Sequence, residues 1–395
     1  MTAIDFRKEA QDLMEYTRSL RRDFHRHPEL GFQEHRTAGI VARELRELGL
    51  DVQEGVGKTG VVALLKGAHP GPTVLVRADM DALPIQEENQ TDYASENPGV
   101  MHACGHDAHT AMLLTVARIL SAHRDALHGT VKFVFQPAEE GMGGAESMVK
   151  DGVLEGVDYV LAMHVWNDRP VGWLGIVPGP AMAAAERFQI RVIGKGGHAA
   201  HPELTEDPVV AAAHIVTALQ TVVSRHVDPL EAAVVSVTML QAGTAFNIVP
   251  PEARLEGTIR TFEPDVTREV RMRFQRTVHG VAQGLGCRAE IVLDDLTPAV
   301  INDPEVTKIV QETAAELFPE AEIDTTHRTM GSEDMAFMMY NIPGCYFFVG
   351  SANPAKGLDA PHHHPRFDID EDALPIGVAL MAASIVAVGE RFAAS

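Results

Sequence analysis

Apolar residues near the N-terminus recur every three or four positions, which is the spacing of a helix with one buried face. Two such sets occur before the first strand-like segment: Leu13, Tyr16, Leu20 and Phe24, then Ile40, Val41, Leu45 and Leu48. Gly49 follows the second set and is a typical stop signal. The chain is therefore expected to begin with helices.

From residue 60 onward the pattern changes, because short apolar runs alternate with helical periodicity. The predicted strands in this part are 60–66, 73–78, 130–135 and 159–163, and the predicted helices are 107–122 and 145–150. The same alternation of helices and strands returns near the C-terminus, with helix 304–317, strand 345–349 and helix 373–388. Strands separated by helices are typical of an α/β fold with a largely parallel sheet.

The segment between these two parts has a different order of elements. Its predicted strands are 188–193, 233–240, 253–261 and 288–293, and its predicted helices are 208–227 and 266–285. This βαββαβ order is that of a ferredoxin-like unit. We therefore predict one domain formed by residues 1–185 and 295–395, interrupted by an inserted domain at 186–294.

Composition narrows the class of protein. The 395 residues include 33 Lys and Arg and 55 Asp and Glu, giving a formal net charge of −22, so a nucleic-acid partner is not expected. An apolar fraction of 45% and a charged fraction of 22% are ordinary for a folded globular protein and exclude disorder, collagen and coiled coil.

The cysteines and the apolar segments indicate a compartment. Three scattered cysteines do not form a disulfide framework, and the first eleven residues lack the apolar core of a signal peptide. The longest apolar stretch, 376–389, is too short to span a bilayer. We expect a cytoplasmic protein without a membrane partner.

Nineteen histidines are unusual, and five donor side chains of three types, His, Cys and Asp, fall within residues 102–109, at the start of a predicted helix. Cys104 and His106 lie two residues apart in a glycine-containing loop, which suits Zn²⁺ or a similar ion. A single histidine here would be read as capping the helix. The density of donors favours a metal.

Adjacent carboxylates, Glu139 and Glu140, follow the strand at 130–135 and precede Gly141, Gly143 and Gly144. Because glycines permit close approach of the backbone, this pair differs from two acids on a solvated helix face. One carboxylate could bind a metal while the other moves protons, as metal-assisted hydrolysis requires.

Other donors also follow predicted strands. Asp79 ends one strand, His164 follows another, and three consecutive histidines at 362–364 come one loop after the last strand. Since ligands bind outside the carboxyl ends of strands in open α/β sheets, these segments can converge on one site. His164 alone would be read as a core histidine, and only one or two of the three histidines can face one site. Cys104 as a covalent nucleophile, with His106 as its base, is a less favoured alternative.

Several motifs resemble those of one enzyme family. They are Phe24-His-Arg-His-Pro-Glu-Leu-Gly-Phe, Arg77-Ala-Asp-Met-Asp-Ala-Leu-Pro, His102-Ala-Cys-Gly-His-Asp-Ala-His, Gln136-Pro-Ala-Glu-Glu-Gly, Gly331-Ser-Glu-Asp and His363-His-Pro-Arg-Phe. Together they resemble the hippurate hydrolase and auxin-conjugate hydrolase branch of the aminoacylase and carboxypeptidase G metallopeptidases. The resemblance covers almost the whole chain and implies a di-metal catalytic domain with an inserted lid or dimerisation domain.

The resemblance also implies roles for individual residues. The implied metal ligands are Cys104, His106, Glu140, His164 and His363. Glu139 would be the general base, and Asp79 would fix the orientation of a ligand without binding the metal itself. His198 would stabilise the oxyanion in a neighbouring subunit, and Asn247 and Arg260 would hold a substrate carboxylate. The implied cofactors are two divalent ions, Zn, Mn, Co or Ni.

The expected reaction is cleavage of an N-acyl or N-aroyl amino acid, such as hippurate or an N-acetyl amino acid, by metal-activated water. The inserted domain is expected to form a homodimer, with a tetramer as the alternative. Two other functions remain open. One is a dipeptidase or carboxypeptidase of the same fold, and the other is a metal- or ligand-binding relative without catalysis. A binding protein would have no need of the carboxylate at Glu139 that does not bind metal.

Overall fold

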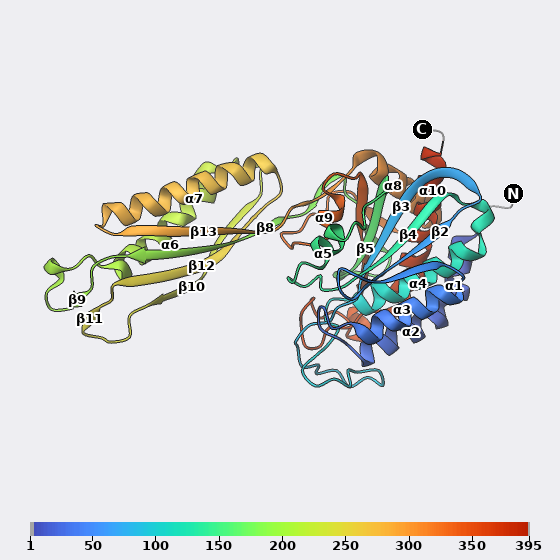
Figure 1. Ribbon diagram of the computed structural model, residues 1–395, viewed down its shortest axis with the longest axis horizontal. Coiled ribbons are helices and arrows are strands. Elements are labelled where there is room, and N and C mark those ends of the chain that lie inside the picture. The colour runs from blue at the N-terminus through green and yellow to red at the C-terminus, as the bar shows by residue number, and fades with distance from the viewer. Residues whose placement is uncertain (1–3, 394–395) are drawn as a thin grey trace. The chain divides into compact units, whose positions relative to one another are not determined.

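The structure is a computed structural model that describes residues 4–393, and in it the chain divides into two compact units (Figure 1). Unit 1 contains Met1–Ala181, Ile301–Arg328 and Asp334–Ser395, and unit 2 contains Met182–Val300 and Thr329–Glu333. Each unit has its own cluster of buried apolar residues. The short strands β7 (Gly179–Met182) and β14 (Val300–Asn302) span the points where the chain passes from one unit to the other.

Unit 1 is built on an eight-stranded sheet in the order β1-β2-β4-β3-β5-β16-β6-β15. The strands, in that order, are Asp51–Val56, Gly60–Lys66, His128–Gln136, His69–Asp79, Tyr159–Pro170, Gly344–Ala352, Trp173–Gly175 and Glu322–Asp324. The four central strands, β4, β3, β5 and β16, run parallel to one another, whereas β1, β2 and β6 pair antiparallel with their neighbours toward the centre. A parallel centre places several strand ends at the same edge.

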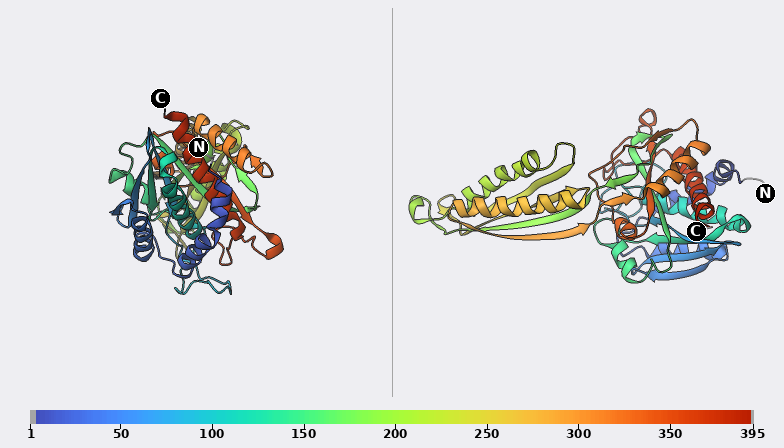
Figure 2. Two further views of the ribbon diagram at one scale, coloured as in Figure 1. Left: turned by 90° about the vertical axis from the view of Figure 1, so that its right-hand side faces the viewer. Right: turned by 90° about the horizontal axis from the view of Figure 1, so that it is seen from above.

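The helices of unit 1 pack against this sheet or on one another (Figure 2). Those that contact the sheet are α3 (His35–Glu47), α4 (His106–Ala122), α5 (Gly144–Lys150), α8 (Pro304–Leu317) and α10 (Leu374–Phe392). The others, α1 (Phe6–Asp12), α2 (Met14–Arg26) and α9 (Ala336–Met339), pack on helices. Both α4 and α10 contact β3, and α4 is buried over almost its whole length because nearly all its side chains are apolar or small.

One helix in the described part of the chain is long and apolar enough to cross a membrane by composition, at residues 371–392. Its most apolar window is 72% buried inside unit 1. The apolar character of α10 is therefore accounted for by packing against the sheet and against α4 and α8.

Unit 2 has a four-stranded antiparallel sheet in the order β10-β12-β8-β13. Its main elements are β8 (Ala184–Ile193), α6 (Pro208–His226), β10 (Ala233–Ala242), β12 (Glu252–Thr261), α7 (Pro264–Gly284) and β13 (Arg288–Thr297). The two helices pack on each other and on the sheet, where the rings of Phe188 and Phe274 lie 4.7 Å apart. The opposite face carries ion pairs, such as Arg191 with Glu252 at 2.7 Å.

The predicted fold class is confirmed: the protein is α/β with a largely parallel central sheet, and unit 2 has the βαββαβ order. The predicted elements lie where the pattern placed them. The sequence pattern missed the edge strands β1 and β15 and the short strand β6 beside β15, and it ended β5 at residue 163, although the strand continues to Pro170. It was misled there because His164, Trp166 and Asn167 interrupt the apolar run.

Candidate active site

Three parallel neighbours in the centre of the sheet carry predicted site residues near the level at which β3 and β4 end. Asp79 is the last residue of β3, the pair Glu139 and Glu140 follows β4, and His164 lies in β5. The loop with Cys104 leads into His106, the first residue of α4. The parallel centre thus brings these segments together, as the pattern predicted.

Cys104 belongs to two clusters of metal-ligating atoms. In one cluster, the ligating atoms of Cys104, His106 and His164 lie within 4.8 Å of one another. In the other, Cys104 is grouped with Glu140 and His363 within the same limit. The structure therefore brings all five predicted ligands together around the Cys104 thiol. Thiolate, imidazole and carboxylate are the donor types that zinc and similar ions prefer.

His106 has one ring nitrogen held and the other free of hydrogen bonds. Its Nδ1 lies 2.9 Å from the carbonyl oxygen and 3.2 Å from a carboxylate oxygen of Asp81. Its Nε2 is buried and has no hydrogen-bond partner in the described structure. This is the usual arrangement of a metal-ligating histidine, whose second nitrogen donates to a carboxylate or carbonyl. The buried Nε2 therefore fits a metal ligand.

His164 is oriented in the same way. Its Nδ1 lies 2.5 Å from the carbonyl oxygen of Val165, and its Nε2 lies 3.5 Å from the sulfur of Cys104. Burial, together with the nearby His109 and His362, holds the pKa of His164 well below its ordinary value. The neutral ring keeps a lone pair available for a cation.

Cys104 itself is not set up as a free nucleophile. Burial raises the pKa of its thiol, and the carboxylate of Glu140 raises it further. A reactive cysteine instead needs a lowered pKa. A thiol in this position would be ionised by a bound cation rather than by His106 acting as a base.

Two of the three consecutive histidines, His362 and His363, lie near the cluster and make different contacts. The Nε2 of His362 accepts the backbone N–H of Asn167 at 3.1 Å, and its Nδ1 lies 3.7 Å from the Cys104 sulfur. His363 is oriented by its backbone, at φ 66°, and its Nε2 lies 3.0 Å from Glu140. Hydrogen bonds with Cys104 and Glu140 raise the pKa of His363 to about 10. The position between these groups thus favours positive charge.

Glu139 and Glu140 make different contacts. The backbone N–H of Glu140 donates to Asp81 at 3.0 Å, and its side chain joins the cluster with Cys104 and His363. Glu139 is grouped with His106 and Glu140, and also with Glu333 and Asp334, each within 4.8 Å, but not with Cys104. Its Oε1 lies 3.5 Å from the backbone N–H of Asp334. Of the two adjacent glutamates, Glu140 alone is therefore grouped with the Cys104 sulfur.

Asp79 supports the site through His109. Its Oδ1 lies 2.7 Å from His109 Nδ1, and the Nε2 of that ring accepts the backbone N–H of Val165 at 2.9 Å. Both nitrogens of His109 are therefore engaged, so this member of the histidine-rich motif is structural. The charges of His106, Arg77 and His109 outweigh burial and hold the pKa of Asp79 well below its ordinary value.

Arg77 ties the ends of two strands to a third segment. Its buried guanidinium contacts Asp79 at 2.6 Å, Gln136 at 2.8 Å and Asp334 at 3.3 Å. Gln136 also donates to Asp334 at 2.7 Å. The strand ends that carry Asp79 and the glutamate pair are thus fixed relative to each other.

Sequence reasoning missed the part played by Asp81. It selected Asp79 to orient a ligand, yet the carboxylate in contact with Nδ1 of His106 is that of Asp81. The signal lay in the same motif, because a second aspartate stands two residues after Asp79. Alternation along an extended chain does not show which of two such aspartates faces the cluster.

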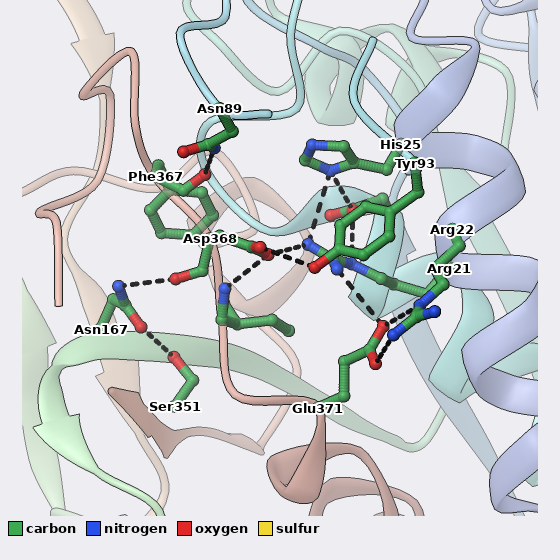
Figure 3. A network of polar contacts seen from close by, with 12 residues as sticks. Arg21, Arg22, His25, Asn89, Tyr93, Asn167, Ser351, Phe367, Asp368 and Glu371 are labelled. Atoms are coloured by element: carbon green, nitrogen blue, oxygen red, sulfur yellow. Dashed lines mark hydrogen bonds and ion pairs between the residues drawn. The ribbon is translucent and has the colours of Figure 1, made fainter. Parts of the chain in front are cut away.

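A network of buried ion pairs contacts Asp107, in the first turn of α4. Figure 3 shows residues of this network. Arg21 is fully buried and contacts Asp107 at 2.9 Å and Asp368 at 2.6 Å. His25 contacts the same Asp107 at 2.8 Å, and Tyr93 donates to Asp368 at 2.7 Å. Because Asp107 follows His106 directly, this network anchors the first turn of the helix that carries the ligand.

The predicted substrate residues lie in unit 2. His198 in β9 (Gly197–His198) pairs with Ile248 in β11 (Ile248–Val249), and the backbone N–H of Ala199 donates to Asn247 at 3.1 Å. The structure thus brings His198 and Asn247 side by side.

Arg260 lies at the other end of the sheet of unit 2. It pairs with Ala185 at the start of β8, whereas His198 comes after the end of β8 at Ile193, a separation of roughly 26 Å along the strand. One copy of unit 2 does not bring His198 and Arg260 together. The Arg260 guanidinium is partly buried, and its NH1 has no hydrogen-bond partner in the described structure.

The largely parallel sheet, with thiol, imidazole and carboxylate donors beside its strand ends, defines an α/β protein with a candidate metal centre. Residues 75–387 match the model of peptidase family M20/M25/M40, and the chain belongs to this family. It is a hydrolytic enzyme that acts on amide bonds.

Two relatives and one solved structure illustrate the family. The chain is 51% identical over 286 residues to an N-acyl-L-amino acid amidohydrolase of Geobacillus stearothermophilus, covering 72% of this chain and 77% of the relative. It is 42% identical over 375 residues to an N-acetylcysteine deacetylase of Bacillus subtilis, covering 94% and 96%. A dinuclear metal binding peptidase of the M20 family from Bacillus subtilis superimposes with a TM-score of 0.86 at 38% identity, covering 96% and 99%.

Proposed function

We propose that this amidohydrolase releases the acyl group from N-acyl or N-aroyl amino acids, of which N-acetyl amino acids and hippurate are representative. The observation that carries the proposal is the pair Glu139 and Glu140, of which Glu140 is grouped with the Cys104 sulfur and Glu139 is grouped with His106 and Glu140 but not with Cys104. Hydrolysis needs a carboxylate beside the metal ligands that moves protons, whereas metal binding alone does not. The named activities of the relatives support the same reaction class.

We infer that the site holds two divalent ions, because Cys104 is shared by two clusters of donors. Cys104, His106, Glu140, His164 and His363 would hold them. The buried Nε2 of His106, which makes no hydrogen bond and lies 3.7 Å from Asp79, and the position of His363, which favours positive charge, support this fit. Zn, Mn, Co and Ni all suit a mixed set of sulfur, nitrogen and oxygen donors. Asp81 would orient the ring of His106 directly. Asp79 would act indirectly, through its hydrogen bond with His109.

Bound divalent ions would polarise the amide carbonyl and lower the pKa of a water molecule toward neutrality. Glu139 would take a proton from that water and later deliver a proton to the leaving amine, acting first as general base and then as general acid. We assign this role to Glu139 and not to Glu140, because the side chain of Glu140 is grouped with Cys104 and lies 3.0 Å from Nε2 of His363.

Substrate recognition would draw on residues of unit 2. The unpartnered NH1 of Arg260 suits a substrate carboxylate, and Asn247 would add an amide hydrogen bond. We assign His198 to oxyanion stabilisation in a partner subunit, because it lies too far from Arg260 within one copy of unit 2. An apolar acyl group is favoured by Trp166, whose partly exposed ring stands 6.1 Å from that of His164.

We propose a homodimer formed through unit 2, with a tetramer as the larger assembly. Strand β10 is the edge of its sheet and carries Met239 and Leu240, which are 45% and 47% exposed. Unpaired edges with apolar side chains are normally covered in folded proteins. We place the enzyme in the cytoplasm, because its cysteines Cys104, Cys287 and Cys345 are free.

The decisive experiment measures hydrolysis of hippurate and a panel of N-acetyl amino acids, with the bound metal quantified in each sample. Glu139→Gln should lower kcat by about 10²–10⁴-fold while metal content stays at the wild-type level. Glu140→Gln, the matched variant at the next position, should lose metal. Full turnover by metal-loaded Glu139→Gln would refute the general-base assignment.

The second candidate function is a dipeptidase or carboxypeptidase, favoured by the peptidase named as the solved relative. The same panel should therefore include dipeptides with free and with acylated N-termini. Preference for acylated compounds supports the amidohydrolase, and preference for free amines supports the peptidase. A fully metal-loaded protein that cleaves neither group would support a role in binding alone.

A further inference from the structure

The segment at residues 31–34, which begins at the end of the first motif noted in the sequence and continues two residues beyond it, contacts the turn that carries the glutamate pair. Glu34 is fully buried. Its Oε1 accepts the backbone N–H of Ala138 at 2.9 Å and that of Phe32 at 3.0 Å. Its Oε2 accepts the hydroxyl of Thr59 at 2.5 Å. The carboxylate of Glu34 therefore binds the backbone of Ala138, the residue directly before Glu139.

Ala138 needs such support because of its backbone conformation. Its φ is 52°, in the left-handed region that residues with a side chain rarely adopt. Conformations of this kind persist only where the surroundings impose them. The carbonyl of Ala138 also accepts the N–H of Gly144 at 3.0 Å, so both polar groups of its backbone are held.

Gly31 constrains the same residue by contact. A Cβ built on Gly31 would lie 3.0 Å from the Cβ of Ala138 and 3.1 Å from its Cα. The second of these atoms belongs to the backbone and cannot move without shifting the turn. Gly31 and Glu34 thus fix Ala138 from one short segment, through packing and through hydrogen bonding.

The backbone conformation of this turn sets the directions in which the side chains of Glu139 and Glu140 point. Glu34 holds the N–H of Ala138, Asp81 holds the N–H of Glu140, and Glu139 lies between these two anchor points. We propose that Glu34 is a positioning residue that keeps Glu139 aimed at the reacting water while Glu140 remains in the donor cluster. This inference rests on the proposed role of Glu139 as general base.

The experiment compares three variants of the full-length, metal-loaded enzyme. Glu34→Met keeps the side-chain volume but removes both acceptors, so kcat should fall by about 10²-fold, with KM within about threefold and metal content unchanged. Glu34→Gln keeps one acceptor for the two N–H groups if the Thr59 hydroxyl turns to accept from the amide, so it should recover most of that loss. Thr59→Val, the matched control, removes a partner of Glu34 but not the contact with Ala138, and should keep kcat.

A merely structural role predicts another result. Glu34→Met and Thr59→Val would then both lower Tm, and both would keep kcat while folded. That outcome overturns the proposal. Should Glu34→Met fail to fold, Gly31→Ala displaces the same turn without unpairing a polar group and must show the same selective fall in kcat. A normal kcat in folded Gly31→Ala would then overturn the proposal.

A double variant separates this inference from the proposed function. If Glu34 acts through Glu139, then adding Glu34→Met to Glu139→Gln should lower kcat by less than about twofold further. A further 10²-fold loss in the double variant overturns the positioning role. Wild-type activity in Glu139→Gln refutes the general base itself. An inactive Glu139→Gln beside a fully active Glu34→Met refutes only the inference about Glu34.

Discussion

His106 is held by Asp81 through two contacts, because its Nδ1 lies 2.9 Å from the carbonyl oxygen and 3.2 Å from the carboxylate of that residue. The same carboxylate accepts the backbone N–H of Glu140 at 3.0 Å. One side chain therefore orients two of the proposed ligands, which stand on different segments of the chain.

Asp81→Asn should weaken metal binding by about 10–100-fold, the usual effect of removing a carboxylate that orients a ligating histidine. Competition with a fluorescent chelator would measure the affinity. Asp125→Asn, at an exposed position in the loop after α4, is the matched control and should bind metal as the wild type does. Unchanged affinity in Asp81→Asn would show that His106 is oriented without this carboxylate.

His109→Leu should lower stability but not metal content. The substitution leaves Asp79 Oδ1 and the N–H of Val165 without their partner, at a cost of about 2–4 kcal/mol. Thermal unfolding gives the loss of stability, and elemental analysis gives the metal content. His106→Leu is the comparison and should lose metal. Equal loss of metal in both variants would mean that His109 is itself a ligand.

The contribution of His25 to stability should depend on pH. Burial and the charge of Arg21 lower the pKa of His25, but the carboxylates of Asp107 and Glu87 outweigh them and raise it to about 9. Because the folded pKa lies above the unfolded value of about 6.5, the stabilisation is fully present below pH 6.5 and is lost as pH rises through about 9.

The measurement is Tm between pH 6 and 9.5 for the wild type and His25→Gln. The wild type should be the more stable protein at pH 6, by up to about 3 kcal/mol, and the difference should shrink steadily toward pH 9.5. A difference that is independent of pH would show that His25 contributes as a neutral ring.

Met239→Lys should dissociate the proposed dimer. Met239 lies on the edge strand β10, where a two-fold pairing would bring two lysines together. Light scattering after gel filtration should give the mass of one chain. Met272→Lys on α7 is the control, because Met272 is 50% exposed and Met239 is 45% exposed. A dimer that survives Met239→Lys would exclude this edge as the interface.

Much of the active site could be predicted because its residues follow strong local patterns. Cys104, His106 and the glutamate pair stand where an apolar run ends or a helix begins, and donors at such positions are visible in a sequence. His164 was harder to predict, because a histidine in a buried strand has the same pattern whether it binds a metal or only fills the core. Its orientation depends on the carbonyl of Val165 and on the distant Cys104.

Residues that act through the backbone of another segment were not predictable. Glu34 and Ala138 are 104 positions apart in the chain, and the hydrogen bond between them exists only because α3 and the end of β4 meet in the fold. The left-handed conformation of Ala138 has no signature in the sequence, since alanine carries no preference for it.

The sequence by itself determined the α/β class, the order of elements in unit 2 and the chemistry of the donor set, because periodicity and residue type are local properties. The tertiary structure decided which of Asp79 and Asp81 contacts Nδ1 of His106, that both ring nitrogens of His109 are engaged, and that Glu34 binds the backbone of Ala138. These relationships depend on distances between segments that are far apart in the chain. Such distances are set by the packing of the whole sheet and its helices, and no local pattern encodes them.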